Sequence, residues 1–307
     1  MEDQKARRLN VSLAYLTVIA IWSTTPLAIR VSALDTGFAF ALMIRMAIGV
    51  VLAFTIIAVW RIEFPLHSRA RRSYLIGGLG MFGGMLCTYW GALYVHSGLI
   101  SVLFGLSPLV TSVLAVRWLN EPALNFRKLT GMLLALAGLA GIFLSGHEIS
   151  GFQAVMGTAV LLLGMLIYSA TLVALKRIND TSPPLATTAG TLIVAMPLFI
   201  LAWWLADGQI PAEFSFWGGA AIAYLGVFGS VVGFALYYFV IKHMEAGKVA
   251  LITLVTPVMA LLLGNFLNGE IVTVRVWLGA GLITLGLVVH QITVLVELIR
   301  QPSPKCS

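Results

Sequence analysis

Arg45 is the one charged residue that lies deep inside an apolar segment of this chain. An arginine at the centre of a membrane helix costs about 2.5–3.5 kcal/mol, so it is expected to face the protein interior and to serve a function. No Asp or Glu lies at a similar depth, which leaves carbonyl groups, water or an anionic ligand group as partners. A guanidinium binds a carboxylate through two parallel hydrogen bonds. The alternative is that Arg45 follows Gly37 closely enough for its side chain to reach the membrane interface.

Tyrosine and tryptophan residues occupy the middle of several apolar segments, although such residues usually gather at membrane interfaces. Their ring N–H and O–H groups need a partner, which a water-filled cavity supplies; ordinary helix packing is the alternative for each. Trp22 and Ser23 match Tyr168 and Ser169 in a repeat described below. We therefore predict a substrate-binding cavity, and the residues expected to line it are Trp22, Ser23, Arg45, Tyr89, Trp90, Tyr168, Ser169 and Tyr238.

Pro108 and Pro257 are each preceded by a hydroxyl residue, Ser107 or Thr256, and each lies inside an apolar segment. Proline removes a helical hydrogen bond and clashes with the carbonyl group four residues earlier. A freed carbonyl in lipid needs a partner, so such kinks usually face protein or a water-filled cavity. We predict that both prolines bend helices around the cavity and act in gating; a kink that only shapes packing is the alternative.

The elements that position these residues are predicted to be membrane helices. Hydrophobic residues make up 60% of the chain and charged residues 10%, and the mean hydropathy is +0.98, far above soluble-domain values. Helices satisfy their own backbone hydrogen bonds in lipid, and the segments are too long and too continuously apolar for barrel strands. We predict ten spans, at about residues 9–29, 37–60, 73–96, 98–119, 127–145, 152–175, 185–205, 214–241, 247–268 and 274–297.

The second five spans repeat the first five. The stretch from Gly77 to Glu121 aligns without a gap with the stretch from Gly226 to Glu270, and several Gly, Tyr, Pro and Glu residues coincide. Glycine and proline are special in helices, so their shared register carries weight. Because five is odd, the second copy must lie inverted in the bilayer, as is typical of alternating-access transporters. Spans two and seven pair most weakly, because Arg45 has no basic counterpart.

We therefore predict an all-α integral membrane protein with ten transmembrane helices in a five-plus-five inverted-topology repeat. Residues 1–146 form the first repeat and residues 147–307 the second. Glu121 and Glu270 end spans four and nine on opposite membrane sides, where we expect capping or interface roles. The glycines of span three are expected to allow close helix contact.

Lysine and arginine residues gather at both ends of the chain and in alternate loops, whereas acidic residues show no such bias. This distribution predicts that both termini face the cytoplasm, together with Arg69 and Lys128, and that Asp207 and Glu148 face the other side. The net charge of +7 is thus explained by topology and by contact with anionic lipid, so no nucleic-acid partner is expected.

Enzymatic motifs are missing from the sequence. It contains no HExxH, GxSxG, CxxC or Walker pattern, and Cys87 and Cys306 are expected at different depths. We expect no enzymatic activity, no cofactor and no metal. A channel should carry a repeated polar filter or a charged ring, which is not found. A channel or a purely structural membrane protein remains the alternative to a carrier.

Three stretches of this sequence resemble EamA-type drug/metabolite transporters: the run GALYVHSGLISVLFGLSPLVTSVLAVRWLNE, its counterpart KVALITLVTPVMALLLGNFLNGE, and the IWST of the first span. The resemblance covers essentially the whole chain. It implies a ten-helix carrier of the bacterial inner membrane whose central cavity is lined mainly by spans one to four and six to nine.

The resemblance further implies the export of small metabolites such as neutral or aromatic amino acids, whereas other members carry drugs or nucleotide sugars. The expected partners are a small-molecule substrate and the lipid bilayer. Monomer and homodimer both stay open, as do proton-coupled and facilitated transport, because no intramembrane Asp or Glu is present.

Overall fold

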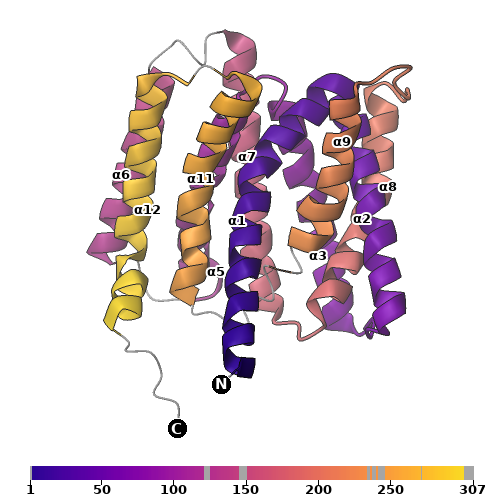
Figure 1. Cartoon of the computed structure of the whole chain (residues 1–307), viewed down its shortest axis with the longest axis horizontal. Coiled ribbons are helices and arrows are strands. Elements are labelled where there is room, and N and C mark those ends of the chain that lie inside the picture. Colours follow the sequence, from indigo (N-terminus) through magenta and orange to yellow (C-terminus); the bar gives the residue numbers. More distant parts are fainter. Residues whose placement is uncertain are drawn as a thin grey trace.

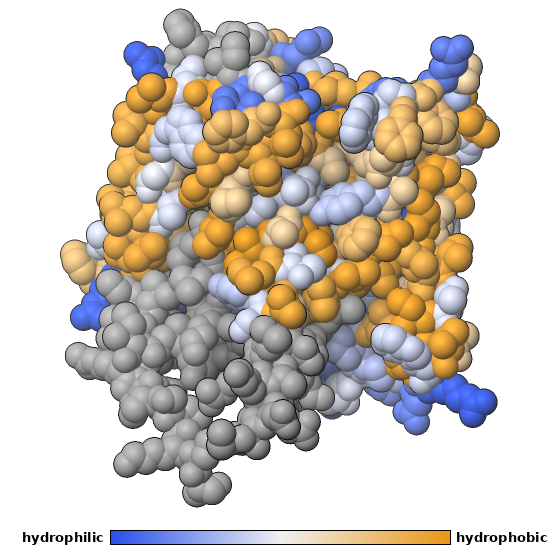
Figure 2. All heavy atoms as spheres, in the orientation of Figure 1, coloured by the Kyte–Doolittle hydropathy of each residue, from blue (hydrophilic) through white to orange (hydrophobic). Residues whose placement is uncertain are grey.

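Helices form all the regular structure that a computed structural model describes, which covers residues 2–120, 125–144, 151–233, 236, 240, 246–270 and 272–300. The helices stand side by side along one common direction, and the first helix begins at the same end of the molecule at which the last helix ends (Figure 1). Figure 2 shows a broad apolar belt between two ends at which hydrophilic residues gather. This distribution fits a protein whose middle is surrounded by lipid.

The elements account for ten spans. The first half comprises α1 (Glu2–Thr36), α2 (Phe38–Trp60), α3 (Ser68–Gly91), α4 (Ser97–Phe104), α5 (Ser107–Trp118) and α6 (Phe126–Leu144). The second half comprises α7 (Phe152–Ile178), α8 (Pro184–Ala206), α9 (Phe216–Tyr224), the π-helix η1 (Leu225–Val232), α11 (Ala246–Asn268) and α12 (Val274–Arg300). Helices α4 and α5 together make span four, while α9 and η1 lie in span eight. The predicted fold class is confirmed; the division between residues 146 and 147 lies outside the described residues and stays a prediction.

The predicted limits of span three are wrong at both ends. Helix α3 begins at Ser68, because the His67 Nδ1 atom accepts a hydrogen bond from the Ala70 N–H group (3.2 Å) and caps the helix. It ends at Gly91 rather than at residue 96. The apolar residues that follow form turns, since the Leu93 N–H group bonds the Trp90 carbonyl (3.2 Å). Hydropathy alone does not distinguish such buried turn residues from helix.

The outer helices α6 and α12 pack against each other at one edge of the molecule (Figure 1). The sequence repeat equates Gly131 with Gly279 and Gly138 with Gly286. In the structure the contacts are crossed: Gly131 lies against the Gly286 carbonyl group, and Gly138 against the Gly279 carbonyl group. Crossed contacts between equivalent residues are what a two-fold axis produces. The structure therefore places the axis that relates the two halves between α6 and α12, where small residues permit close packing.

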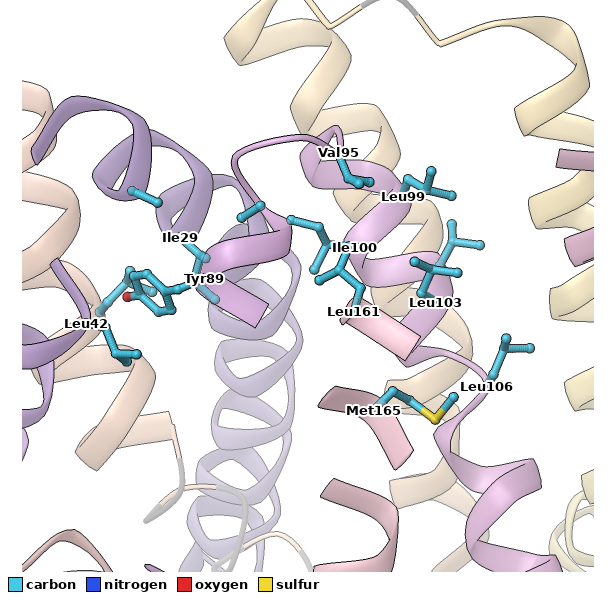
Figure 3. Close-up of a cluster of buried hydrophobic side chains, with 14 of the residues drawn as sticks. Ile29, Leu42, Tyr89, Val95, Leu99, Ile100, Leu103, Leu106, Leu161 and Met165 are labelled. Carbon is cyan, nitrogen blue, oxygen red and sulfur yellow. The ribbon is translucent and has the colours of Figure 1, made fainter. Parts of the chain in front are cut away.

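Helix α3 packs closely against both α7 and α8 through its glycines. A Cβ atom at Gly77 would lie 2.5 Å from the Thr191 Oγ1 atom of α8, and one at Gly91 would lie 2.5 Å from Leu161 of α7. Large apolar side chains fill the neighbouring core, in which Leu161 and Met165 lie near the residues of α4 (Figure 3). Helix α3 belongs to the first repeat, whereas α7 and α8 belong to the second, and the space between these three helices is the natural place for a site.

Candidate functional site

A cavity lies between α3, α7 and α8, with Phe104 at the end of α4 on its wall. Three kinds of side chain share its surface: threonines, apolar residues with two aromatic rings, and the glycines of α3. They are Thr88, Thr171, Thr187, Thr188, Thr191, Met81, Met85, Leu172, Leu175, Phe104, Tyr168, Gly77, Gly80 and Gly84. No Asp, Glu, Lys, Arg or His occurs among these described lining residues. The first turns of α8 supply Thr187 and Thr188, so the cavity belongs to the half of the membrane predicted to face the cytoplasm.

Four of the five threonines that line the cavity already donate their hydroxyl proton to the backbone. Thr88, Thr171, Thr187 and Thr188 donate to the carbonyl group four residues earlier in their own helix, at 2.7, 2.8, 3.4 and 2.9 Å. A hydroxyl group has one proton to donate and two lone pairs that accept. With their protons used by the backbone, these groups present acceptors to the cavity. The cavity therefore favours a ligand that carries hydrogen-bond donors.

Arg45 of α2 is buried within the protein, with 2% of its surface exposed. Its Nε atom donates to the Ser230 hydroxyl group (3.2 Å) and its Nη1 atom to the Tyr89 hydroxyl group (3.4 Å). The guanidinium carbon also lies 5.9 Å from the centre of the Tyr89 ring, within the range of a cation–π contact. Among the described residues no carboxylate lies within ion-pair distance of Arg45.

The π-helix η1 places Ser230 against this arginine. The Ser230 hydroxyl group donates to the carbonyl group of Leu225, five residues earlier (3.0 Å), so it is free to accept from Arg45. The preceding residue, Gly229, leaves room for the guanidinium: a Cβ atom there would lie 3.3 Å from its Nη2 atom. π-Helical turns are frequent at functional sites. Sequence reasoning found Arg45 but missed Ser230, whose signal is a lone hydroxyl residue beside a glycine.

Tyr89 and Trp90 are neighbours in sequence with different surroundings. Tyr89 is fully buried and lies beside Leu42 in the core (Figure 3), where its hydroxyl group meets Arg45. Trp90 lies one residue before the end of α3 and packs against Tyr94, with ring centres 4.9 Å apart. Trp90 is not among the residues that line the described cavity.

The aromatic and hydroxyl residues matched by the repeat also differ in their surroundings. Tyr168 lines the cavity and meets Phe104 edge to face at 6.3 Å, and the Ser169 and Ser107 hydroxyl oxygens lie 2.9 Å apart. Trp22 instead packs against a small apolar cluster that joins α1 to α11. Tyr238 lies outside the described residues.

The two prolines occupy the same register but shape their helices differently. Helix α4 ends at Phe104 and α5 starts at Ser107, so Pro108 is the second residue of a new helix rather than the site of a kink. Pro257 lies inside α11, which is continuous from Ala246 to Asn268. The two regions meet, because a Cβ atom at Gly105 would lie 3.3 Å from the Pro257 ring. Sequence reasoning missed Gly105, which interrupts the helix together with Pro108 and gives Pro257 room.

Two segments of the chain match the model of one protein family. The model of the EamA-like transporter family matches the chain twice, over residues 10–144 and 155–290. The chain belongs to the EamA-like transporter family. It is therefore a multi-pass membrane transporter built from two family units, and not an enzyme.

Several relatives of the transporter have been described in bacteria. It is similar to Protein PagO of Salmonella typhimurium (24% identical, 86% of each chain covered) and to the uncharacterized transporter YoaV of Bacillus subtilis (25% identical, 93% and 98% covered). The uncharacterized inner membrane transporter YedA of Escherichia coli K12 is 29% identical over 63% of this chain and 61% of its own. A crystal structure with 19% sequence identity shares the fold, with a TM-score of 0.66 over 93% of this chain and 98% of that one.

Proposed function

We propose that this transporter is an alternating-access carrier of the bacterial inner membrane that exports small metabolites, with neutral or aromatic amino acids as its preferred substrates. The observation that supports this substrate class is the acceptor-rich, aromatic-walled and uncharged cavity between α3, α7 and α8. YedA, a relative, is named as an inner membrane transporter, which supports the location. The inverted repeat supports alternating access.

The cavity suits the ammonium and the side chain of such a substrate. An ammonium group carries three N–H donors and no acceptor, and the threonines that donate to the backbone offer it acceptor lone pairs. The rings of Phe104 and Tyr168 add a surface that attracts cations and apolar groups. Met81, Met85 and Leu172 provide an adaptable apolar wall for the side chain.

Arg45 is assigned to the substrate carboxylate. It does not line the described cavity, yet Thr88 of the cavity and Tyr89, the partner of Arg45, are consecutive on α3. We propose that the substrate carboxylate contacts the Arg45 guanidinium in another conformational state of the carrier, in which α3 and η1 have moved apart. A buried cation that is held only by hydroxyl groups is incompletely compensated, so an anionic group would be favourable there. A dianionic sugar nucleotide fits less well, because one arginine leaves much phosphate charge unpaired.

Transport by purified protein in liposomes tests this function. We expect saturable uptake of labelled neutral and aromatic amino acids, and counterflow when unlabelled substrate is preloaded, each measured with and without a pH gradient. Thr171→Val and Thr188→Val should reduce the transport of amino acids more than the transport of their N-acetyl derivatives, which lack the ammonium group. Thr130→Val is the matched control, because Thr130 also donates to its own helix (2.9 Å) but lies on α6 and does not line the cavity.

Two results would contradict the proposal in different ways. Flux that does not saturate and shows no counterflow would indicate a channel instead of a carrier. Counterflow that is present but insensitive to the cavity threonines would reject the cavity as the ammonium site, while alternating access would stand.

A further inference from the structure

A buried carboxylate joins α1, α4 and α11 at the membrane side opposite to the chain termini. Glu270 follows the end of α11 and is 5% exposed. Its two carboxylate oxygens accept hydrogen bonds from the Ser97 N–H group (3.2 and 3.1 Å), and one of them also accepts from the Ser97 hydroxyl group (2.8 Å). The Asn268 side chain donates to the other oxygen (3.0 Å), and the Arg30 Nε atom lies 3.4 Å from it.

The same cluster holds the connection between α3 and α4. The Arg30 Nη1 atom donates to the carbonyl groups of Ala92 (3.1 Å) and Val95. Gly264 of α11 makes space for the carboxylate, because a Cβ atom there would lie 2.5 Å from Glu270 Oε2 and 2.8 Å from the Ser97 hydroxyl oxygen. Elements of the first repeat are thus fastened to the end of α11 in the second repeat, at one end of the pathway.

The repeat places equivalent residues at the opposite membrane side. Both charges recur, because Lys176 corresponds to Arg30 and Glu121 to Glu270. The residues before the two glutamates, Asn120 and Gly269, share a left-handed backbone, with φ of 54° and 61°. Glu121 itself lies outside the described residues, so its side is inferred from the sequence alone.

The neutral partners of the carboxylate do not recur. Ser97, Gly264 and Asn268 correspond to Ala246, Ala115 and Leu119, which have no side-chain donor. At the opposite side the sequence therefore supplies the two charges without the serine hydroxyl, the asparagine amide and the glycine. Each hydrogen bond to a charged group changes an equilibrium by roughly ten- to a hundredfold, so the described bonds to Glu270 should hold these helices together strongly.

We propose that Arg30, Glu270 and Ser97 form the outer gate of the carrier. These contacts keep the resting carrier closed to the outside and accessible from the cytoplasm. This inference rests on the proposed alternating-access function. A resting state that opens to the cytoplasm suits an exporter, because an exporter binds its substrate from the cytoplasm. The state that binds substrate is then already the populated one.

Thiol labelling from outside tests the outer gate. The background variant carries Cys87→Ser and Cys306→Ser, and Ser101→Cys on α4, one turn beyond Ser97, is the reporter. The rate of modification by a membrane-impermeant reagent is measured in intact cells. We expect Glu270→Gln to raise this rate roughly tenfold or more, because the charged hydrogen bonds and the ion pair are weakened.

Two further variants in this background separate the gate from general damage. Ser97→Ala keeps both charges and removes one hydroxyl hydrogen bond, so it should raise the labelling rate by a smaller factor. If Glu270→Gln fails to fold, the labelling rate of Ser97→Ala tests the outer gate on its own. Glu213→Gln is the matched control, because it removes an exposed carboxylate on the same predicted side and should leave the rate unchanged.

Unchanged labelling in Glu270→Gln and Ser97→Ala, with counterflow intact, would overturn the gate and leave the proposed function standing. A wild-type protein without counterflow would instead overturn the proposed function.

Discussion

Replacing Arg45 by glutamine separates a role in recognising the substrate carboxylate from a role in holding the helices together. Arg45 is buried and its described partners are two hydroxyl groups, Ser230 and Tyr89. A glutamine amide at this position still offers a donor to one of them. The structural cost should therefore fall equally on every substrate, whereas a lost contact with carboxylate should fall only on acids.

The expected magnitude follows from the strength of a charged hydrogen bond. Loss of such a bond costs about 1.5–3 kcal/mol, and each 1.4 kcal/mol is about tenfold. Arg45→Gln should therefore reduce kcat/KM for an amino acid about 10- to 150-fold more than for the corresponding amide. The ratio of acid to amide removes any common loss from folding or from the rate of conformational change.

The assay is the initial rate of uptake into liposomes for matched pairs of acid and amide. Ser230→Ala serves as the control, because it removes one partner of Arg45 but keeps the positive charge. In that variant acid and amide should change by similar factors. Equal losses of acid and amide in Arg45→Gln would refute carboxylate recognition and assign Arg45 to packing between α2, α3 and η1.

Three further predictions concern the helices. Pro108→Ala and Pro257→Ala should slow counterflow several-fold at normal expression, because a straighter helix alters the balance of inward and outward states; unchanged rates in both and in the double variant would reduce them to packing. Gly80→Ala should lower the free energy of unfolding by about 1–3 kcal/mol, because the new Cβ atom would overlap the Thr171 hydroxyl group. Adding Thr171→Ala to this variant should restore the lost stability, as measured by thermal unfolding. A cysteine at Arg69 should resist an impermeant reagent in intact cells, and labelling from outside would reverse the topology.

The inverted repeat could be predicted from the sequence because its markers are residues with few substitutes. Glycine in a close helix contact cannot gain a Cβ atom without a clash, so Gly131 and Gly138 keep the same register as Gly279 and Gly286. The structure uses all four at the contact between α6 and α12. Lipid-facing positions of the helices can hold any apolar side chain, so these positions do not reveal the repeat.

The π-helix η1 could not be predicted in the same way. Its glycines, Gly226 and Gly229, align with Gly77 and Gly80, yet that part of α3 is a regular α-helix. The local sequence therefore allows both forms. The π-helical turn coincides with the contact between Ser230 and Arg45, which depends on a helix far away in the sequence.

The cavity threonines were missed for a different reason. A threonine that donates to its own helix resembles an ordinary helix-surface residue, and a search for charges and aromatic rings passes over it. Thr187, Thr188 and Thr191 become a site only because the glycine face of α3 leaves a space opposite them. That space depends on how three helices from both repeats pack, which no single segment encodes.

The two repeats carry equivalent serine and proline residues but differ in local structure there, and this difference suggests how the carrier alternates between its two states. Ser169 pairs with Ser107, and the helix beside it is interrupted at Pro108. Its repeat counterpart Ser23 is 1% exposed and its hydroxyl group has no partner among the described residues, while α11 stays continuous through Pro257. In an inverted repeat, exchange of the two shapes produces the opposite-facing state without any new fold. On the proposed mechanism, the Ser23 hydroxyl group gains a hydrogen-bond partner when the two shapes exchange. The hydrogen bond between Ser169 and Ser107 breaks in the same step.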